Sequence, residues 1–128
     1  MNIIDLIKYI TFVCGSENKI PLKRLVRILF LIDWSSSIEN RRQITDIQWF
    51  VKKGVLYAHN LKCFIVSSEE LLLNEVLNQT GETYQEIELT INFTNDIQNN
   101  FSNLDSNIIE NISNIVTRYT DEQLYNIV

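Results

Sequence analysis

The sequence predicts an α+β fold that is predominantly α-helical, with about five helices around a central apolar helix, a short strand and a small antiparallel β-hairpin. Apolar residues recur at helical spacing in several segments, whereas other segments alternate apolar and polar residues as strands do. The 128 residues include three Gly and one Pro, and 45% of them are apolar. This length and composition indicate one compact domain, which we expect to span residues 1–128.

Two stripes of apolar side chains predict the first two helices. One helix is expected over Ile3–Cys14, and Gly15 follows at the position of a C-terminal cap. A second helix is expected to begin at Pro21, because proline is favoured in the first turn, and to end near residues 35–37. Since residues 25–32 are apolar almost all round, we expect this segment to be the buried centre of the fold.

The middle of the chain predicts a strand and a short helix. Ile47, Trp49 and Val51 alternate with polar residues, which is typical of a strand, and Gly54 is expected to end it. A short helix over Ala58–Val66 is then expected, with its apolar side chains turned toward the core.

A β-hairpin is predicted from the next two segments. Its arms are Leu71–Leu77 and Thr83–Ile91, and the loop between them contains Gly81, which adopts positive φ without strain. In the second arm the apolar residues alternate with Glu86 and Glu88. The outward face of this hairpin is therefore expected to be acidic.

The C-terminal region predicts two more helices. Asp105 is a suitable N-cap for a helix whose apolar stripe runs from Ile108 to Tyr119. Thr120 and Gln123 form a capping box, which predicts a final short helix. Together with the three earlier helices, these make the expected total of about five.

Charge is distributed unequally along the chain. Residues 1–64 carry ten Lys or Arg and five Asp or Glu, a net charge of +5, whereas residues 65–128 carry one Arg and eleven acidic residues, a net charge of −10. The asymmetry predicts two electrostatically distinct faces, of which the basic one would meet an acidic partner or nucleic acid. The alternative is that the two halves attract each other within the fold.

The sequence has no features of export. Residues 1–14 have no basic region and no small-residue cleavage site, and no apolar run approaches the roughly 18 residues of a membrane span. We therefore expect a cytoplasmic protein without a membrane partner. In that compartment Cys14 and Cys63 are expected to be reduced thiols in the core.

The sequence indicates no catalytic or metal-binding set of residues. His59, the single histidine, pairs by spacing with Cys63 as two metal ligands at most, because Cys14 is distant in sequence. A structural zinc site needs four ligands, and three isolated Gly do not form a phosphate-binding loop. We therefore expect no enzyme, no cofactor and no metal, with a Cys–His nucleophile pair as the weak alternative.

A DNA-binding regulator is the rival hypothesis. The first two predicted helices loosely resemble a helix-turn-helix, and basic residues with Trp49 and Phe50 nearby suit phosphate contact and base stacking. Against this, the pI of the sequence is about 4.8, whereas nucleic-acid-binding domains are usually basic. The apolar second helix also has the composition of a core element.

Three segments resemble a known protein family. Arg24–Asp33 is similar to the core helix of the Panacea, or SocA-like, antitoxin domain, and Ile44–Gly54 resembles that family's segment with an Ile-Thr pair, a Trp and a Gly-Pro. Residues 104–124 are similar to the family's closing pattern, so the match runs from about residue 4 to the end. In one departure, Val55 replaces the family's proline, which would leave a strand-to-helix corner less rigid.

The resemblance implies an antitoxin-like protein of bacterial or phage origin. Domains of this family neutralise different toxins by direct protein contact, one relative acts as a protease adapter, and no catalytic residues come with the family. We therefore expect the chain to hold a toxin or effector protein in an inactive complex. Autoregulatory DNA binding and delivery of a bound protein to a protease are the alternatives.

The candidate partner contacts are basic residues and one Trp in the first half of the chain. They are Lys23, Arg24, Arg27, Arg41, Arg42, Trp49, Lys52 and Lys53. Aromatic and Arg side chains are the usual anchors of an interface, whereas charge mainly steers the encounter. The alternative for each basic residue is a solvated surface charge. For Trp49 the alternative is a place in the core, where Trp34 is also expected.

Overall fold

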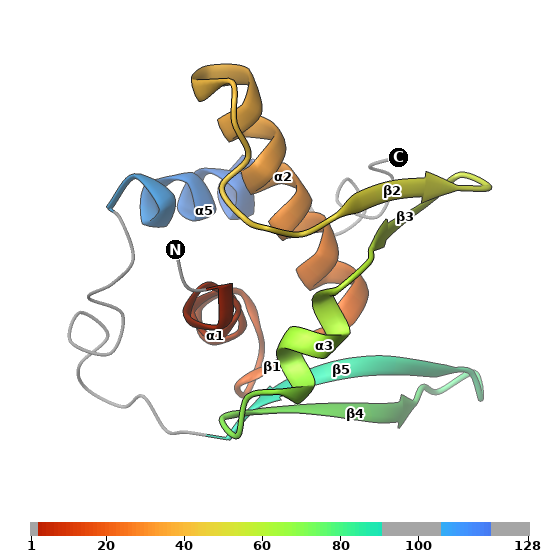
Figure 1. Ribbon diagram of the computed structural model, residues 1–128. Helices are drawn as coiled ribbons and strands as arrows, with labels where there is room; N and C mark the ends of the chain where they lie inside the picture. The colour runs from red at the N-terminus through yellow and green to blue at the C-terminus, as the bar shows by residue number, and fades with distance from the viewer. Residues whose placement is uncertain (1–2, 91–105, 119–128) are drawn as a thin grey trace.

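The computed structural model describes residues 3–90 and 106–118, which form an α+β fold (Figure 1). The helices are α1 (Ile3–Cys14), α2 (Leu22–Asn40), α3 (Leu61–Val66) and α5 (Ser106–Arg118). The strands are β1 (Lys19–Pro21), β2 (Trp49–Lys52), β3 (Val55–Ala58), β4 (Leu71–Leu77) and β5 (Thr83–Leu89). These strands make two antiparallel sheets, one of three strands in the order β1-β5-β4 and one of two strands, β2-β3.

The expected arrangement of about five helices around a central helix is wrong. The described residues contain four helices and five strands, of which β1 and β3 were not predicted. Both strands are short, and β1 ends at a proline that helix rules assign to the first turn of α2. The final helix predicted at Thr120 lies outside the described residues.

Strand β3 was missed because Gly54 does not end the strand structure. Lys53 and Gly54 have φ values of 52° and 76°, and Lys52 pairs with Val55. Two consecutive positive φ values are what a two-residue type I′ hairpin turn requires. The strand-to-helix corner expected at Gly54-Val55 is therefore the turn of a β-hairpin, and the following helix begins at Leu61 instead of Ala58.

Helix α1 has the predicted bounds, and Gly15 ends it for a steric reason. The Gly15 amide donates to the carbonyl oxygen of Thr11 over 3.1 Å. A Cβ atom at this position would lie 2.4 Å from the carbonyl oxygens of Thr11 and Lys19. Because both neighbours are backbone atoms, they cannot move aside cheaply.

Replacing Gly15 with Ala is expected to lower the free energy of unfolding by about 1–3 kcal/mol, the usual cost of overpacking. The cause is the overlap of the new methyl group with two backbone oxygens. Urea unfolding followed by circular dichroism measures the change. Ser16→Ala at the exposed neighbouring position is the control and should stay within about 0.5 kcal/mol of the parent. Equal stability of the two variants would contradict the close packing at residue 15.

Helix α2 supplies much of the core, as predicted for residues 25–32. Leu25, Ile28, Leu29 and Ile32 are fully buried, and α5 packs against the same helix. The helix extends beyond its predicted end to Asn40, where Arg41 takes a left-handed conformation. Trp34, just before that predicted end, is 52% exposed, so its expected place in the core is wrong.

The three-stranded sheet carries α1 and α3 over one face (Figure 1). Its hairpin, β4–β5, was predicted, and Ile87 and Leu89 face the core as expected. The side-chain oxygen of Asn78 orders the connecting loop, because it accepts hydrogen bonds from the amides of Thr80 and Glu82 at 3.0 and 2.9 Å. The predicted end of the second arm at residue 91 lies outside the described residues.

Candidate functional site

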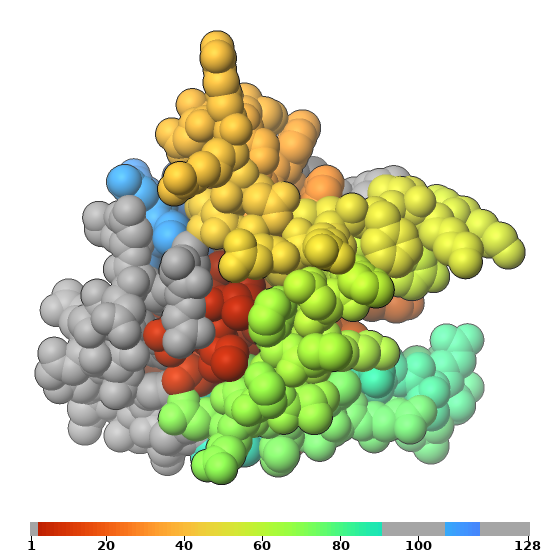
Figure 2. Space-filling model, viewed as in Figure 1, coloured from red at the N-terminus to blue at the C-terminus, as the bar shows by residue number. Residues whose placement is uncertain are grey.

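Strands β2 and β3 form a hairpin that projects from the body of the molecule (Figures 1 and 2). Trp49 pairs with Ala58, and Phe50 pairs with Tyr57. Because side chains alternate between the two faces of a strand, Trp49 and Ala58 lie on one face and Phe50 and Tyr57 on the other. The first face is partly buried, whereas both aromatic residues of the second are exposed.

The exposed side of this hairpin is an aromatic surface. The rings of Phe50 and Tyr57 stack with centroids 5.1 Å apart and an interplanar angle of 15°, although each residue is 43% exposed. The ring of His59 lies 6.1 Å from that of Phe50. Lys52 and Val55, the next cross-strand pair on this side, are also exposed. We call these five residues the hairpin face.

Trp49 lies on the opposite side and fixes the base of the hairpin to α2. Its indole nitrogen donates to Oδ2 of Asp33 over 2.7 Å, and its ring meets Phe30 edge-on at 5.4 Å. Trp49 is therefore partly buried against the body of the molecule. This agrees with the alternative interpretation of Trp49, which placed it in the core and not at a partner contact. The geometry gives it the role of an anchor for the hairpin face.

Asp33 holds the segment that leads into the hairpin. This carboxylate is 2% exposed and accepts hydrogen bonds from the amides of Ile44 and Thr45 at 3.0 and 2.8 Å. The hydroxyl of Thr45 and the indole of Trp49 also donate to it. One buried acceptor thus ties α2 to the start of β2, and buried carboxylates are stabilised by such donors.

The hairpin lies in a part of the chain without acidic residues. Residues 47–68 contain no Asp or Glu, although the chain as a whole has a net charge of −5. Among residues 3–90 and 106–118, no carboxylate forms an ion pair with Lys52 or Lys53. Elsewhere, salt bridges join the basic and acidic halves of the chain. Lys8 pairs with Glu70, and Nζ of Lys19 lies 3.6 Å from Oε1 of Glu88. Attraction between the basic and acidic halves of the chain was the alternative to a charged partner. It therefore accounts for the ion pairs of Lys8 and Lys19.

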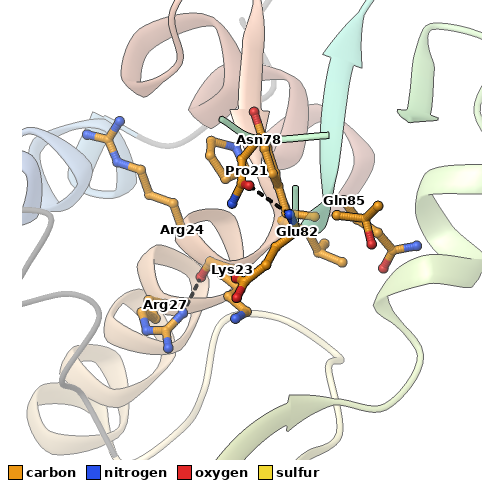
Figure 3. A pocket seen from close by; sticks show the side chains of 10 residues that line it. Pro21, Lys23, Arg24, Arg27, Asn78, Glu82 and Gln85 are labelled. Atoms are coloured by element: carbon orange, nitrogen blue, oxygen red, sulfur yellow. Dashed lines mark hydrogen bonds between the residues drawn. The ribbon is translucent and has the colours of Figure 1, made fainter. Parts of the chain in front are cut away.

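A second candidate surface is a cleft of about 660 Å³ between the start of α2 and the end of the β4–β5 hairpin (Figure 3). Lys23, Arg24 and Arg27 line it from α2, and Glu82 is the acidic residue of its lining. The other lining residues are Pro21, Leu22, Asn78, Thr83, Tyr84 and Gln85. We call this the basic cleft, because its lining includes three cationic residues and one acidic residue.

The two arginines of the basic cleft are held by backbone oxygens. Arg24 donates to the carbonyl oxygen of Cys14 over 2.8 Å, and Arg27 donates to that of Lys23 over 3.1 Å. Burial raises the pKa of the Cys14 thiol to about 11, and the charge of Arg24 opposes this shift. These bonds hold the Arg24 side chain against the end of α1 and the Arg27 side chain against the preceding turn of α2.

The structure separates the eight candidate contacts into three groups. Lys23, Arg24 and Arg27 meet in the basic cleft. Trp49, Lys52 and Lys53 belong to the β2–β3 hairpin and its turn, whereas Arg41 and Arg42 are exposed at the end of α2. Sequence reasoning did not assign Tyr57 to a site, because its pairing with Phe50 depends on the unpredicted strand β3.

The histidine and cysteines do not form a site in the described part of the chain. His59 precedes α3 instead of sharing a helix with Cys63. Cys63 is exposed, which contradicts its expected place in the core, whereas Cys14 is buried as expected. No group of three or more metal-ligating side chains occurs within residues 3–90 and 106–118.

Comparison with protein-family models, with curated proteins and with solved structures finds no match to this chain. Within residues 3–90 and 106–118, no helix combines the length and the apolar character needed to cross a lipid bilayer. The hairpin face and the basic cleft are therefore the surfaces of the described residues that bear on function.

Proposed function

We propose that this chain is an antitoxin-like protein-interaction domain that binds a toxin or effector protein in the cytoplasm and holds it inactive. The observation that carries the proposal is the stacked, exposed pair of Phe50 and Tyr57 beside Lys52. Exposed aromatic residues on a fixed support are the usual anchors of protein interfaces. The sequence resemblance to the Panacea, or SocA-like, domains supports the same class of function.

The charge of the hairpin selects the kind of partner surface. Lys52 and Lys53 stand at its turn, and residues 47–68 carry no acid that would repel an acidic partner. The matching surface is an apolar pocket for the two rings with carboxylates around it. In such an interface the rings supply affinity, and the lysines raise the rate of association and exclude basic competitors.

Co-expression of this chain with candidate toxins tests the proposal, and growth of the cells is the readout. Each toxin candidate encoded next to this gene is induced alone and together with this chain, and growth is recorded. We expect one toxin to arrest growth alone and to be neutralised by the chain. Lys52→Glu with Lys53→Glu should weaken the rescue, whereas Lys62→Glu, an exposed lysine on α3, should not. Arrest that persists with every toxin would overturn the antitoxin proposal.

DNA binding is the rival outcome, because aromatic rings beside lysines also suit nucleic acids. A gel shift with the DNA upstream of the gene, repeated over a range of salt concentrations, separates the two functions. We expect no shift at physiological salt, since the net charge of −5 opposes a phosphate backbone. A shift that weakens steeply with salt, together with failure of every toxin rescue, would favour a DNA-binding regulator.

A further inference from the structure

Strand β4 has an open edge in the three-stranded sheet. It lies last in the order β1-β5-β4 (Figure 1), and its pairing with β5 runs without interruption from Leu71 to Leu77. Within residues 3–90 and 106–118, no strand pairs with its other edge. This edge is therefore a row of backbone groups with which another strand can pair.

Four residues of β4 turn their backbone groups toward the open edge. In an antiparallel pair, successive residues turn their N–H and C=O groups to opposite sides. Residues 70 and 78 face β5, because the oxygen of Glu70 accepts from the amide of Thr90 over 2.9 Å and the amide of Asn78 donates to the oxygen of Glu82 over 2.8 Å. The even-numbered residues of β4 therefore face β5 as well. The residues that face the open edge are Leu71, Leu73, Glu75 and Leu77.

This edge lacks the features that usually prevent strands from pairing. Residues 71–77 contain no Pro and no Lys, and the constant register with β5 leaves no bulge. Leu72 and Leu77 are 46% and 67% exposed, and Glu75 is the single charged residue of the strand. Natural edge strands are usually interrupted by charges, prolines or bulges, so an edge of this kind favours a paired state.

A second copy of β4 matches this edge about a two-fold axis at Asn74. Antiparallel pairing about that axis sets Leu71 opposite Leu77 of the second copy, and Leu73 opposite Glu75 of the second copy. By symmetry the reverse pairs form as well, and the N–H and C=O groups of each pair exchange two hydrogen bonds. All four outward-facing residues of both copies are then bonded, whereas an axis at another residue leaves one end of the strand unpaired.

The apolar and amide side chains suit the same register. On one face of the joined sheet Leu72 lies opposite Val76 of the second copy, and on the other face Leu71 lies opposite Leu77. Both exposed leucines therefore gain an apolar neighbour across the axis. Asn74 lies opposite its own copy, and a carboxamide both donates to and accepts from an identical group.

The charge of β4 is also compatible with self-pairing. About an axis at Asn74, the carboxylate of Glu75 lies opposite Leu73 of the second copy. An axis at Glu75 would instead set two carboxylates face to face, and like charges directly opposite each other destabilise a strand pair. The single charge of the strand therefore favours the register that bonds all four outward-facing residues.

We propose that β4 binds β4 of a second copy of this chain, antiparallel about a two-fold axis at Asn74, so that two three-stranded sheets join into one continuous sheet. The main chain supplies the hydrogen bonds, and the leucines supply the apolar surface that is buried. The edge belongs to a different sheet from the hairpin face. This proposal and the proposed toxin binding can therefore fail independently.

Sedimentation of the full chain at increasing concentration tests the pairing. We expect a reversible shift from the 15.0 kDa of one chain to about 30 kDa. By hydrogen exchange, the outward amides of Leu73 and Glu75 should exchange more slowly as the dimer forms, whereas the amide of Asn74 already bonds to β5 and should change little. A chain that stays monomeric up to its solubility limit, or a dimer without this alternating protection, would overturn the proposal.

A charge variant and a matched control test the position of the axis. Asn74→Lys sets two like charges face to face at the axis, whereas within one copy the new side chain stands beside Glu86 and Glu88, which favours the fold. It should weaken dimerisation about tenfold or more. Gln79→Lys adds the same charge in the exposed loop of the same hairpin and should leave dimerisation within about twofold of the parent. Equal weakening in both variants, or an undiminished dimer of Asn74→Lys, would contradict pairing at this axis.

Discussion

Replacing Asp33 with Ala is expected to lower the free energy of unfolding by about 3–5 kcal/mol, a loss typical of a broken buried polar network. The substitution removes one acceptor and leaves the donors of Ile44, Thr45 and Trp49 facing a small cavity. Ile44 and Thr45 lie between α2 and the hairpin, and Trp49 is the first residue of β2. We therefore expect the indole of Trp49 to lose its fixed environment, which its fluorescence and near-ultraviolet circular dichroism report.

Two milder variants test the same network. Asp33→Asn keeps one acceptor oxygen but turns an N–H₂ group toward the indole N–H of Trp49, so its cost is expected at about 1–3 kcal/mol. Trp49→Phe removes one donor, while the carboxylate of Asp33 keeps its hydrogen bonds to Ile44 and Thr45. We therefore expect the free energy of unfolding to fall by about 1 kcal/mol. Urea unfolding supplies the three values. The assigned role of Asp33 fails if Asp33→Ala is no less stable than Trp49→Phe.

The elements that the sequence predicted well are those with a long periodic signal. The apolar stripe of residues 25–32 identified the buried part of α2, and the alternation within residues 83–91 indicated the second arm of the β4–β5 hairpin. In α2 and β5 the buried residues recur with the period of a helix and of a strand, so the pattern of apolar residues indicates the structure.

The elements that were missed depend on conformations or pairings that periodicity does not encode. The hairpin turn needs Lys53 in a left-handed conformation, which is uncommon for a lysine. Trp34 and Trp49 are equally apolar in the sequence, yet one is exposed and the other reaches a carboxylate 16 residues away. The basic cleft brings Lys23 beside Tyr84, which no local pattern indicates.

Replacing Phe50 and Tyr57 together with Ala is expected to weaken binding of the neutralised toxin about 100-fold, a loss of about 2.7 kcal/mol. The two rings supply the apolar centre of the hairpin face, and each residue is 43% exposed before binding. The loss of stability should be small in comparison, about 0.5–1.5 kcal/mol for a stacked pair. Calorimetric titration with the toxin identified by growth rescue measures the affinity.

A matched pair of substitutions at other exposed apolar positions makes this result specific. Val66 and Leu77 are 69% and 67% exposed and lie at the ends of α3 and β4. Their joint replacement by Ala removes apolar surface outside the hairpin face and should leave affinity within about twofold of the parent, as most peripheral positions do. If both pairs weaken binding equally, general apolar surface drives association. If neither pair does, the partner contacts another part of the molecule, and the hairpin face loses its role.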